Sequence, residues 1–215
     1  MKQIILVRHG ENDFGKKRLA GRLPGVVLNA NGQEQANQVA AYLSPLNIAA
    51  IYSSPIERAQ QTAQPLCRCK SLPLRIDDGL IEIDYGDFQG KSYRQLRRID
   101  LWKSLASQPL AVRFPGGETF TQACERAVAA VEGILATLQD NQTAVCFTHA
   151  DVIRLVLTHY LCMPLGEFQR LHIDQGSLTV IVVSASGVIV PHINLVLRPF
   201  AGFVVKESRS PASKK

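Results

Sequence analysis

The chain has 215 residues, of which 46% are hydrophobic, so it is long enough for one globular domain with a sizeable core. Its formal net charge is +6, but residues 198–215 hold five basic residues against one acidic residue, a net +4 that leaves +2 for residues 1–197. A folded part so close to neutral is not typical of a nucleic-acid-binding surface, and we expect no nucleic-acid partner.

The sequence also argues against export, membrane insertion and structural zinc. Only four consecutive apolar residues precede Arg8, too few for a signal-peptide core, and no apolar stretch reaches the length of a membrane span. The five cysteines form no even framework, and the pair Cys67 and Cys69 lacks a second pair at zinc-ligand spacing. These features predict a cytoplasmic protein with reduced thiols, no membrane partner and no bound metal.

In the first half of the chain, strands and helices alternate. An apolar run at 4–7 predicts a buried strand that ends in Arg8, His9 and Gly10. A loop at 13–29, rich in glycine and basic residues, either folds over an anionic ligand or is solvated. Helical spacing follows at about 33–43, and a second buried strand is predicted at 49–52. Serine, proline and glutamate from Ser54 onward predict a helix start that places Arg58 in the first turn of a helix running to about residue 67.

The second half continues the alternation. Its pattern predicts a short strand at 72–76 and an acidic loop at 80–90 that contains Glu82. Helical segments at 93–107 and 119–138 follow, and then a buried strand at 143–148 that is followed by His149. A helix at 152–161 and two strands at 177–184 and 188–196 complete the pattern. Such alternation is typical of a layered α/β domain, here over 1–198, with a partial lid at about 77–118. The serine-, proline- and lysine-rich segment 199–215 is expected to be a disordered tail.

The predicted strand and helix ends bring together residues suited to phosphate chemistry. In an open α/β sheet ligands bind at the carboxyl ends of strands, where Arg8, His9 and His149 are placed. Phosphoryl transfer requires positive charge around the phosphate oxygens, which two guanidiniums and an imidazolium supply. A neutral imidazole, as expected for His9, is a competent nucleophile. A carboxylic acid must protonate the departing alcohol and later activate water, and Glu82 is the candidate, unless it only pairs with a nearby arginine.

Five segments resemble motifs of the histidine phosphatase superfamily, in its phosphoglycerate mutase-like branch: LVRHGE at 6–11, SSPIERA at 53–59, LIEIDYGDFQG at 80–90, PGGE at 115–118 and TH at 148–149. This branch includes α-ribazole phosphatase and fructose-2,6-bisphosphatase-type enzymes. The resemblance implies a three-layer α/β/α sandwich with a mostly parallel mixed sheet, and no metal or organic cofactor.

The same resemblance assigns roles to individual residues. It implies that His9 is the phosphorylated nucleophile and that Glu82 is the general acid and base. The catalytic residue His149 would bind phosphate together with Arg8 and Arg58. Many relatives carry threonine or serine where this chain has Asn12, which we expect to supply an equivalent hydrogen bond to phosphate.

The expected function is hydrolysis of a small phosphomonoester metabolite, without metal, through a phosphohistidine, in a monomer or homodimer. One alternative is a cofactor-dependent phosphoglycerate mutase-type phosphotransferase, and another is a non-catalytic phosphate-binding regulatory domain. The separation of His9 and His149 is shorter than in typical mutases, whose larger insertion shields the phosphohistidine from water. This shorter segment favours hydrolysis.

Expected roles can also be given for four further residues or groups of residues. Glu118 either contacts substrate or is a favourable charge near a helix N-terminus. Asp151 and Arg154 are three residues apart and are expected to pair with each other. Arg94, Arg97 and Arg98 form a solvated helical face or meet a polyanion. Trp102 is expected to pack its helix against the core.

Overall fold

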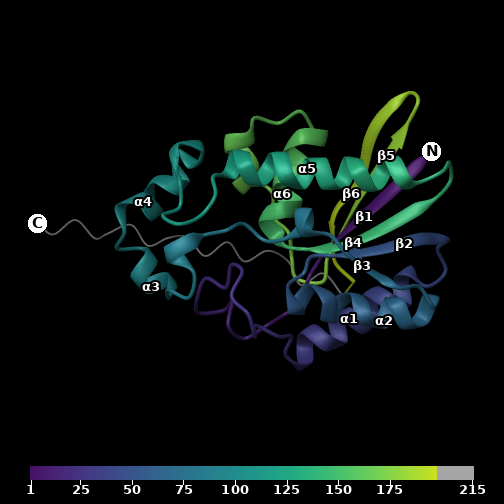
Figure 1. Cartoon of the computed structure of the whole chain (residues 1–215), viewed down its shortest axis with the longest axis horizontal. Helices are drawn as coiled ribbons and strands as arrows, with labels where there is room; N and C mark the ends of the chain where they lie inside the picture. Colours follow the sequence, from purple (N-terminus) through teal and green to yellow (C-terminus); the bar gives the residue numbers. More distant parts are fainter. Residues whose placement is uncertain (198–215) are drawn as a thin grey trace, which may run out of the picture.

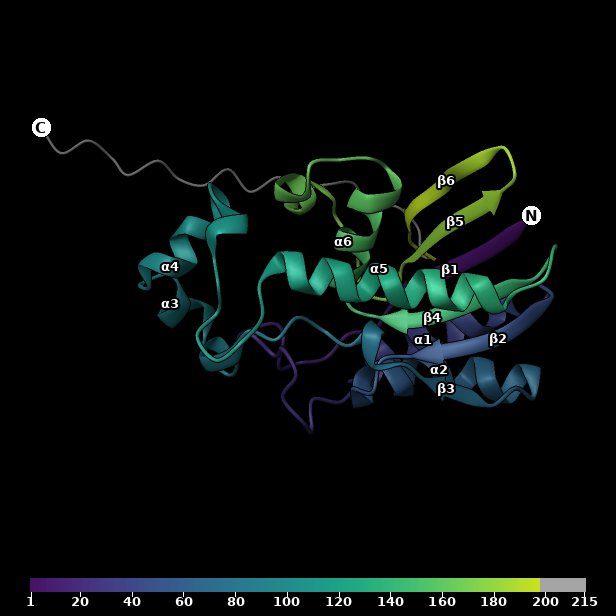
Figure 2. The same cartoon turned by 45° about the horizontal axis from the view of Figure 1, so that its top comes forward.

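The computed structural model describes residues 1–197 and shows a mixed sheet of six strands between two layers of helices (Figures 1 and 2). The strands are β1 (Lys2–Arg8), β2 (Ile48–Ser53), β3 (Leu74–Ile76), β4 (Thr143–Thr148), β5 (Leu178–Ser184) and β6 (Gly187–Leu195). Their order is β3-β2-β4-β1-β5-β6. The first four strands in this order pair in parallel, β5 pairs antiparallel with β1, and β6 pairs antiparallel with β5. The predicted α/β/α fold is therefore confirmed, while the tail predicted at 199–215 lies outside the described residues.

The two helical layers follow from strands that are apolar on both faces. On β1, Ile4 and Leu6 point into the core beneath α5 (Phe120–Thr137) and α6 (Ala150–Tyr160). Their neighbours Ile5 and Val7 point into the opposite core beneath α1 (Ala30–Leu43) and α2 (Glu57–Lys70). Successive strand residues face opposite sides, so a continuous apolar run requires cover on both. Figure 1 shows these helix pairs on the two sides of the sheet.

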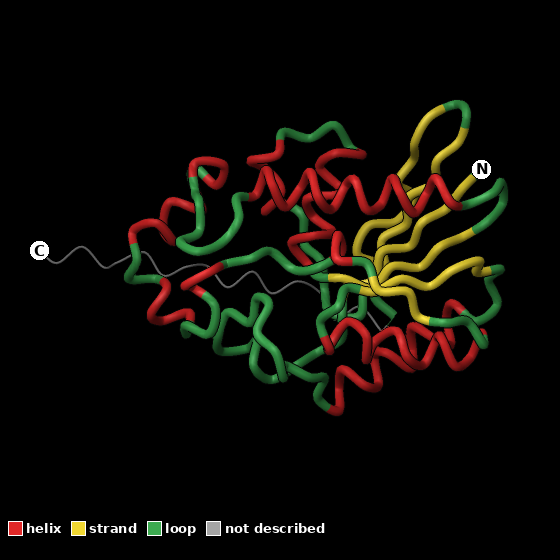
Figure 3. Tube along the Cα trace, in the orientation of Figure 1, coloured by secondary structure: helices red, strands yellow, loops and turns green. Residues whose placement is uncertain are grey.

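The segment between β3 and α5 has little regular structure. The helix predicted at 93–107 is wrong as one element: α3 (Tyr93–Leu96) and α4 (Asp100–Lys103) are separated at Ile99, whose backbone is extended, with φ −92° and ψ 124°. Figure 3 shows short helices joined by loops, lying away from the sheet. The 3₁₀ turns of the described chain are η1 (Asp78–Leu80), η2 (Gly86–Phe88), η3 (Ser104–Ala106), η4 (Pro109–Ala111) and η5 (Leu165–Arg170). This segment packs around its own aromatic core, which includes Phe88 and Phe114.

Two helix starts differ from prediction because of the hydrogen bonds that the preceding polar side chains make. The first helix begins at Ala30 rather than near residue 33, since the Asn29 side chain accepts a hydrogen bond from Gly32 N. The second begins at Glu57 with Ile56 as its N-cap, and no side chain caps it. Ser54 is therefore not the cap that the sequence predicted. It lies directly after β2, and its hydroxyl bonds a histidine instead.

The central strands end level with one another. Arg8 is in register with Thr148 on β4, and Ser53 on β2 is in register with Phe147 of the same strand. The residues that follow β1, β4 and β2 are therefore brought to one edge of the sheet, which is where an open α/β sheet binds ligands.

Candidate active site

His9 follows β1 and is held as a neutral imidazole. Its backbone N–H donates to Thr148 O, and its ring is 5% exposed. Nδ1 lies 2.8 Å from Gly10 O, which fixes the hydrogen on Nδ1, and Nε2 accepts from Arg58 Nε at 3.1 Å. Burial, then the charges of Arg58 and Arg8, hold the pKa of His9 well below its ordinary value. The lone pair of Nε2 is therefore available for nucleophilic attack at neutral pH.

Gly10 is required for packing rather than for an unusual backbone conformation. A Cβ built at Gly10 would lie 2.6 Å from Gly32 O, so any side chain would push the first turn of α1 away from the loop after His9. The close approach of α1 is therefore the reason for a glycine at this position.

His149 follows β4, beside His9, and the two ring centroids are 5.2 Å apart. Its Nε2 lies 2.8 Å from Ser54 Oγ, and its Nδ1 accepts from Arg58 Nη2 at 3.2 Å. Burial, followed by the charge of Arg58, holds the pKa of His149 well below its ordinary value. The structure therefore contains a neutral His149 where we expected an imidazolium, because a buried ring next to an arginine is a poor proton acceptor.

Arg8 and Arg58 are buried cations with unused hydrogen-bond donors. Arg58 is 1% exposed and donates to Gly21 O at 2.8 Å, while Arg8 Nη1 donates to Ile173 O at 2.6 Å. Within residues 1–197, Arg8 Nε and Arg58 Nη1 are buried without a hydrogen-bond partner. Burial lowers the pKa of both guanidiniums, yet arginine keeps its proton in proteins. Two such cations with orphaned donors point to an anionic ligand.

Glu82 is a buried carboxyl beside these cations. Its Oε1 accepts from Ile83 N at 3.0 Å, and its Oε2 is 3.9 Å from His149 Nδ1. Burial and the charge of Asp151 raise the pKa of Glu82 to about 7, against the opposing effect of Arg58. Near neutral pH this carboxyl is therefore populated in both its acid and its base form, as general acid–base catalysis requires.

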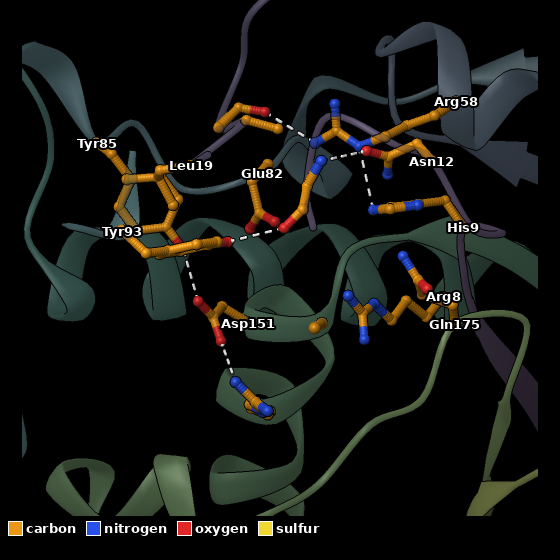
Figure 4. A pocket seen from close by; sticks show the side chains of 15 residues that line it. Arg8, His9, Asn12, Leu19, Arg58, Glu82, Tyr85, Tyr93, Asp151 and Gln175 are labelled. Carbon is orange, nitrogen blue, oxygen red and sulfur yellow. Dashed lines mark hydrogen bonds and ion pairs between the residues drawn. The ribbon is translucent and has the colours of Figure 1, made fainter. Parts of the chain in front are cut away.

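His9, Arg8, Arg58 and Glu82 line a cavity of about 220 Å³ (Figure 4), to which we refer as the phosphate cavity, whereas the fully buried His149 lies behind this lining and its contact with phosphate is still a prediction. Leu19, Ala20 and Gly21 of the loop at 13–29 line it, so this part of the loop does fold over the site. Asn12 also lines the cavity. Its Oδ1 accepts from Gly15 N at 2.7 Å, so only its amide NH₂ can donate to a bound phosphate, and that role is still a prediction. The other lining residues are Arg8, His9, Gly15, Arg58, Glu82, Tyr85, Tyr93, Ala150, Asp151, Arg154 and Gln175.

Glu118 belongs to a cluster of charges that the sequence did not reveal. Its Oε1 accepts from Arg22 Nη2 at 2.9 Å, from Arg126 Nη2 at 2.7 Å and from Asp84 N at 2.9 Å. Arg22 Nε in turn donates to the backbone oxygen of Glu82 at 2.7 Å. We call Glu118, Arg22 and Arg126 the Glu118 clamp. Arg22 is far from Glu118 and Arg126 along the chain, so only the fold shows that these residues hold the backbone of the loop that carries Glu82.

Asp151 is the other site residue whose wider role was missed. Its predicted pairing with Arg154 is confirmed, with Nη1 and Oδ1 2.6 Å apart. Its second oxygen accepts from Tyr85 OH at 2.5 Å, and its charge raises the pKa of Glu82. Its position two residues after His149, in the first turn of α6, is a sequence signal that could have placed it in the site.

Residues 1–197 contain no cluster of three or more histidine, cysteine or acidic side chains placed to hold a metal ion. Over the same range, no helix combines the length and apolarity needed to cross a bilayer. The basic residues of the loop at 13–29 do not line the phosphate cavity, since Lys16 pairs with Glu11 and Asp13, and Arg18 donates to Gly90 O. Arg94, Arg97 and Arg98 are exposed.

A buried neutral histidine, two buried guanidiniums and a carboxyl with a pKa near neutrality are the groups that phosphoryl transfer through a histidine requires. The family model for the histidine phosphatase superfamily (branch 1) matches residues 4–196, and the chain belongs to this family. The resemblance seen in the sequence is therefore confirmed, as is the expected class of enzyme at the level of the family.

Relatives of this chain include both phosphatases and mutases. It is 30% identical over 189 residues to phosphoserine phosphatase 1 of Hydrogenobacter thermophilus, covering 84% of this chain and 86% of that one. It is 31% identical over 186 residues to a 2,3-bisphosphoglycerate-dependent phosphoglycerate mutase of Thermoplasma acidophilum, and the match covers 85% of this chain and 88% of the mutase. The solved structure of Bacillus stearothermophilus YhfR superposes with a TM-score of 0.85 at 26% identity, covering 91% and 98%. The chain spans about half the length, 51%, of three mycobacterial relatives that it also matches.

Proposed function

We propose that this protein hydrolyses phosphomonoesters through a phosphohistidine on His9, without a metal ion. The observation that carries this proposal is the pair of orphaned donors, Arg8 Nε and Arg58 Nη1, buried beside a neutral His9. A dianionic phosphoryl group bound there would satisfy both donors and compensate both buried charges.

In the first step the lone pair of His9 Nε2 attacks phosphorus, and the bond from phosphorus to the ester oxygen breaks. The electron pair goes to the departing oxygen, which takes the proton of the Glu82 carboxyl and leaves as an alcohol. In the structure Arg58 Nε donates a hydrogen bond to His9 Nε2, and with phosphate bound it would donate to a phosphate oxygen instead. Arg8 and Arg58 stabilise the charge on the equatorial oxygens.

In the second step water attacks the phosphohistidine and gives one proton to the Glu82 carboxylate. The bond from phosphorus to Nε2 breaks, inorganic phosphate leaves, and the electron pair returns to His9. Glu82 ends with the proton that it gave in the first step, so the cycle closes. A pKa of about 7 allows the same group to serve both steps.

Hydrolysis is favoured over mutase activity because a mutase must keep water from its phosphohistidine until the second substrate oxygen attacks. By the resemblance drawn from the sequence, the segment between His9 and His149 is shorter than in typical mutases, which supports a site that admits water. The relatives include both activities, so the bisphosphate dependence of the enzyme has to be measured.

The first test compares wild type with His9→Ala and Glu82→Gln in hydrolysis of phenyl phosphate with a chelator present. We expect at least a 10³-fold loss of kcat/KM in His9→Ala and a loss of about 10²–10⁴-fold in Glu82→Gln. Acid-labile phosphate should be trapped on wild type but not on His9→Ala.

Exposed residues of the same types supply controls, and His192→Ala and Glu34→Gln should retain wild-type rates. Turnover only after addition of 2,3-bisphosphoglycerate, with phosphate retained in the organic product, would identify a mutase. Absence of both turnover and labelled protein would contradict the proposal and leave a phosphate-binding domain.

A further inference from the structure

A second cavity adjoins the phosphate cavity. Its volume is about 460 Å³, within the range of roughly 300–1,000 Å³ typical of small-molecule sites. The two cavities share five lining residues, Leu19, Tyr85, Tyr93, Asp151 and Arg154, and are therefore adjacent. In Figure 4, Leu19, Tyr85 and Tyr93 lie on the opposite side of the phosphate cavity from His9 and Arg58. The second cavity thus lies where the alcohol part of a bound ester has to extend.

The walls of this second cavity are aromatic and aliphatic. Beyond the shared residues, it is lined by Trp102, Leu105, Ala106, Phe120, Phe168 and Gln169. These walls are fixed by ring contacts: Phe120 packs on Phe168 with centroids 4.7 Å apart, and Phe88 packs on Trp102 at 6.1 Å. A preformed aromatic wall favours an apolar or aromatic ligand through surface burial and ring stacking.

Among the described residues, the charged side chains that line the second cavity are those of Asp151 and Arg154, which pair with each other at 2.6 Å. Arg154 Nε is buried without a hydrogen-bond partner, but the Asp151 carboxylate already compensates the charge of this guanidinium. A carboxylate on the substrate would have to share Arg154 with Asp151 while lying close to the negative charge of Asp151. This arrangement disfavours esters such as phosphoserine and phosphoglycerate, because like charges repel each other in a buried site.

The geometry points to an uncharged aromatic or bulky apolar alcohol as the leaving group, bound in the second cavity with Trp102 as a specificity-determining residue. This inference rests on the proposed phosphatase function and names its substrate class. It also gives the segment at 93–106 a role in choosing substrate, since that segment supplies Tyr93, Trp102 and Leu105 to the cavity.

The test measures kcat/KM of wild type for four esters: 1-naphthyl phosphate, glycerol 1-phosphate, phosphoserine and 3-phosphoglycerate. We expect 1-naphthyl phosphate to be preferred at least tenfold over each of the two esters that carry a carboxylate. Glycerol 1-phosphate is small and has an uncharged alcohol, so it reports on the phosphate cavity alone.

Trp102→Ala should lower kcat/KM for 1-naphthyl phosphate about tenfold, mainly through KM, and change that for glycerol 1-phosphate less than twofold. Trp102→Phe should restore most of the loss. Leu110→Ala is a matched control, because Leu110 is an apolar residue of η4, close to that segment along the chain, 47% exposed and outside the cavity lining. Wild-type kinetics on glycerol 1-phosphate show that a variant is folded. If Trp102→Ala fails to fold, Leu105→Ala replaces it, and the same selective loss on 1-naphthyl phosphate is expected.

Two results would separate this inference from the proposed function. Hydrolysis that depends on His9 but prefers phosphoserine or 3-phosphoglycerate, or an equal loss on all esters in Trp102→Ala, would overturn the substrate class while the phosphatase proposal stands. If no ester is hydrolysed and no phosphohistidine is trapped, the phosphatase proposal fails and the substrate class fails with it.

Discussion

At the scale of single residues, the site depends on opposite pKa shifts in groups that are all buried. Burial favours the uncharged form of each titratable group, so the pKa of His9 and His149 is lowered and that of Glu82 is raised. The result is a neutral His9, the proposed nucleophile, beside a carboxyl that still holds its proton near neutral pH. Positive charge in the site comes instead from Arg8 and Arg58, which keep their protons despite burial.

The pH dependence of kcat/KM should report the titration of Glu82. Formation of the phosphohistidine requires the protonated carboxyl, so kcat/KM should fall as pH rises through about 7. Asp151→Asn removes a negative charge that raises this pKa, and the descending limb should move to lower pH. Asp140→Asn, at an exposed distant carboxylate, should leave the limb unchanged. An unmoved limb in Asp151→Asn would contradict the assignment of Glu82 as the acid.

At the scale of elements, the proposed catalytic residues His9 and His149 follow strand ends, but the loop that carries Glu82 depends on side chains for its position. Arg22 and Arg126 both donate to this loop's backbone, and both bind Glu118 at the start of α5. A charged hydrogen-bond network of this kind holds an irregular segment that has no ladder of its own. The Glu118 clamp therefore connects the loop at 13–29, the loop that carries Glu82 and α5.

Glu118→Gln should loosen this arrangement. We expect a loss of about 1–3 kcal/mol in the free energy of unfolding, because Arg22 and Arg126 lose their charged acceptor while both are partly buried. We also expect kcat to fall more than KM rises, because Glu82 acts in the chemical step. Urea denaturation and steady-state kinetics measure the two effects, with Glu125→Gln on the same helix as a control. Wild-type stability and kcat in Glu118→Gln would show that the clamp has no such role.

At the scale of the whole molecule, the buried histidines make stability depend on pH. His9 and His149 have a lowered pKa in the folded state, so below about 6.5 the unfolded chain binds protons that the folded chain does not. The Glu82 carboxyl has the opposite effect on stability between about pH 4.5 and pH 7, because in this range only the folded chain holds the proton of this carboxyl. Two histidines outweigh one carboxyl, so these groups lower stability as pH falls from 6.5 toward 5.

His9→Asn removes one of these histidines and should flatten the pH dependence of stability. Each proton contributes about 1.4 kcal/mol per pH unit, so between pH 6 and 5 wild type should lose about that much more stability than the variant. Urea denaturation at several pH values gives the comparison. His192→Asn, at an exposed position, should follow wild type. Parallel wild-type and His9→Asn curves would show that His9 does not titrate on unfolding.

The sequence by itself determined the layered fold and pointed to Arg8, His9, Asn12, Arg58 and Glu82 among the residues that line the phosphate cavity. Strands that are apolar on both faces require helices on both sides, and parallel strands bring their carboxyl ends to one edge. His9, Arg58 and His149 are placed by these local rules, and the family motifs pointed to the same residues. Only the tertiary structure decided the neutral state of His149, the use of Ser54 by that histidine, the Glu118 clamp and the aromatic walls of the second cavity. Each of these depends on burial or on contacts between distant segments, and neither periodicity nor spacing along a chain contains that information.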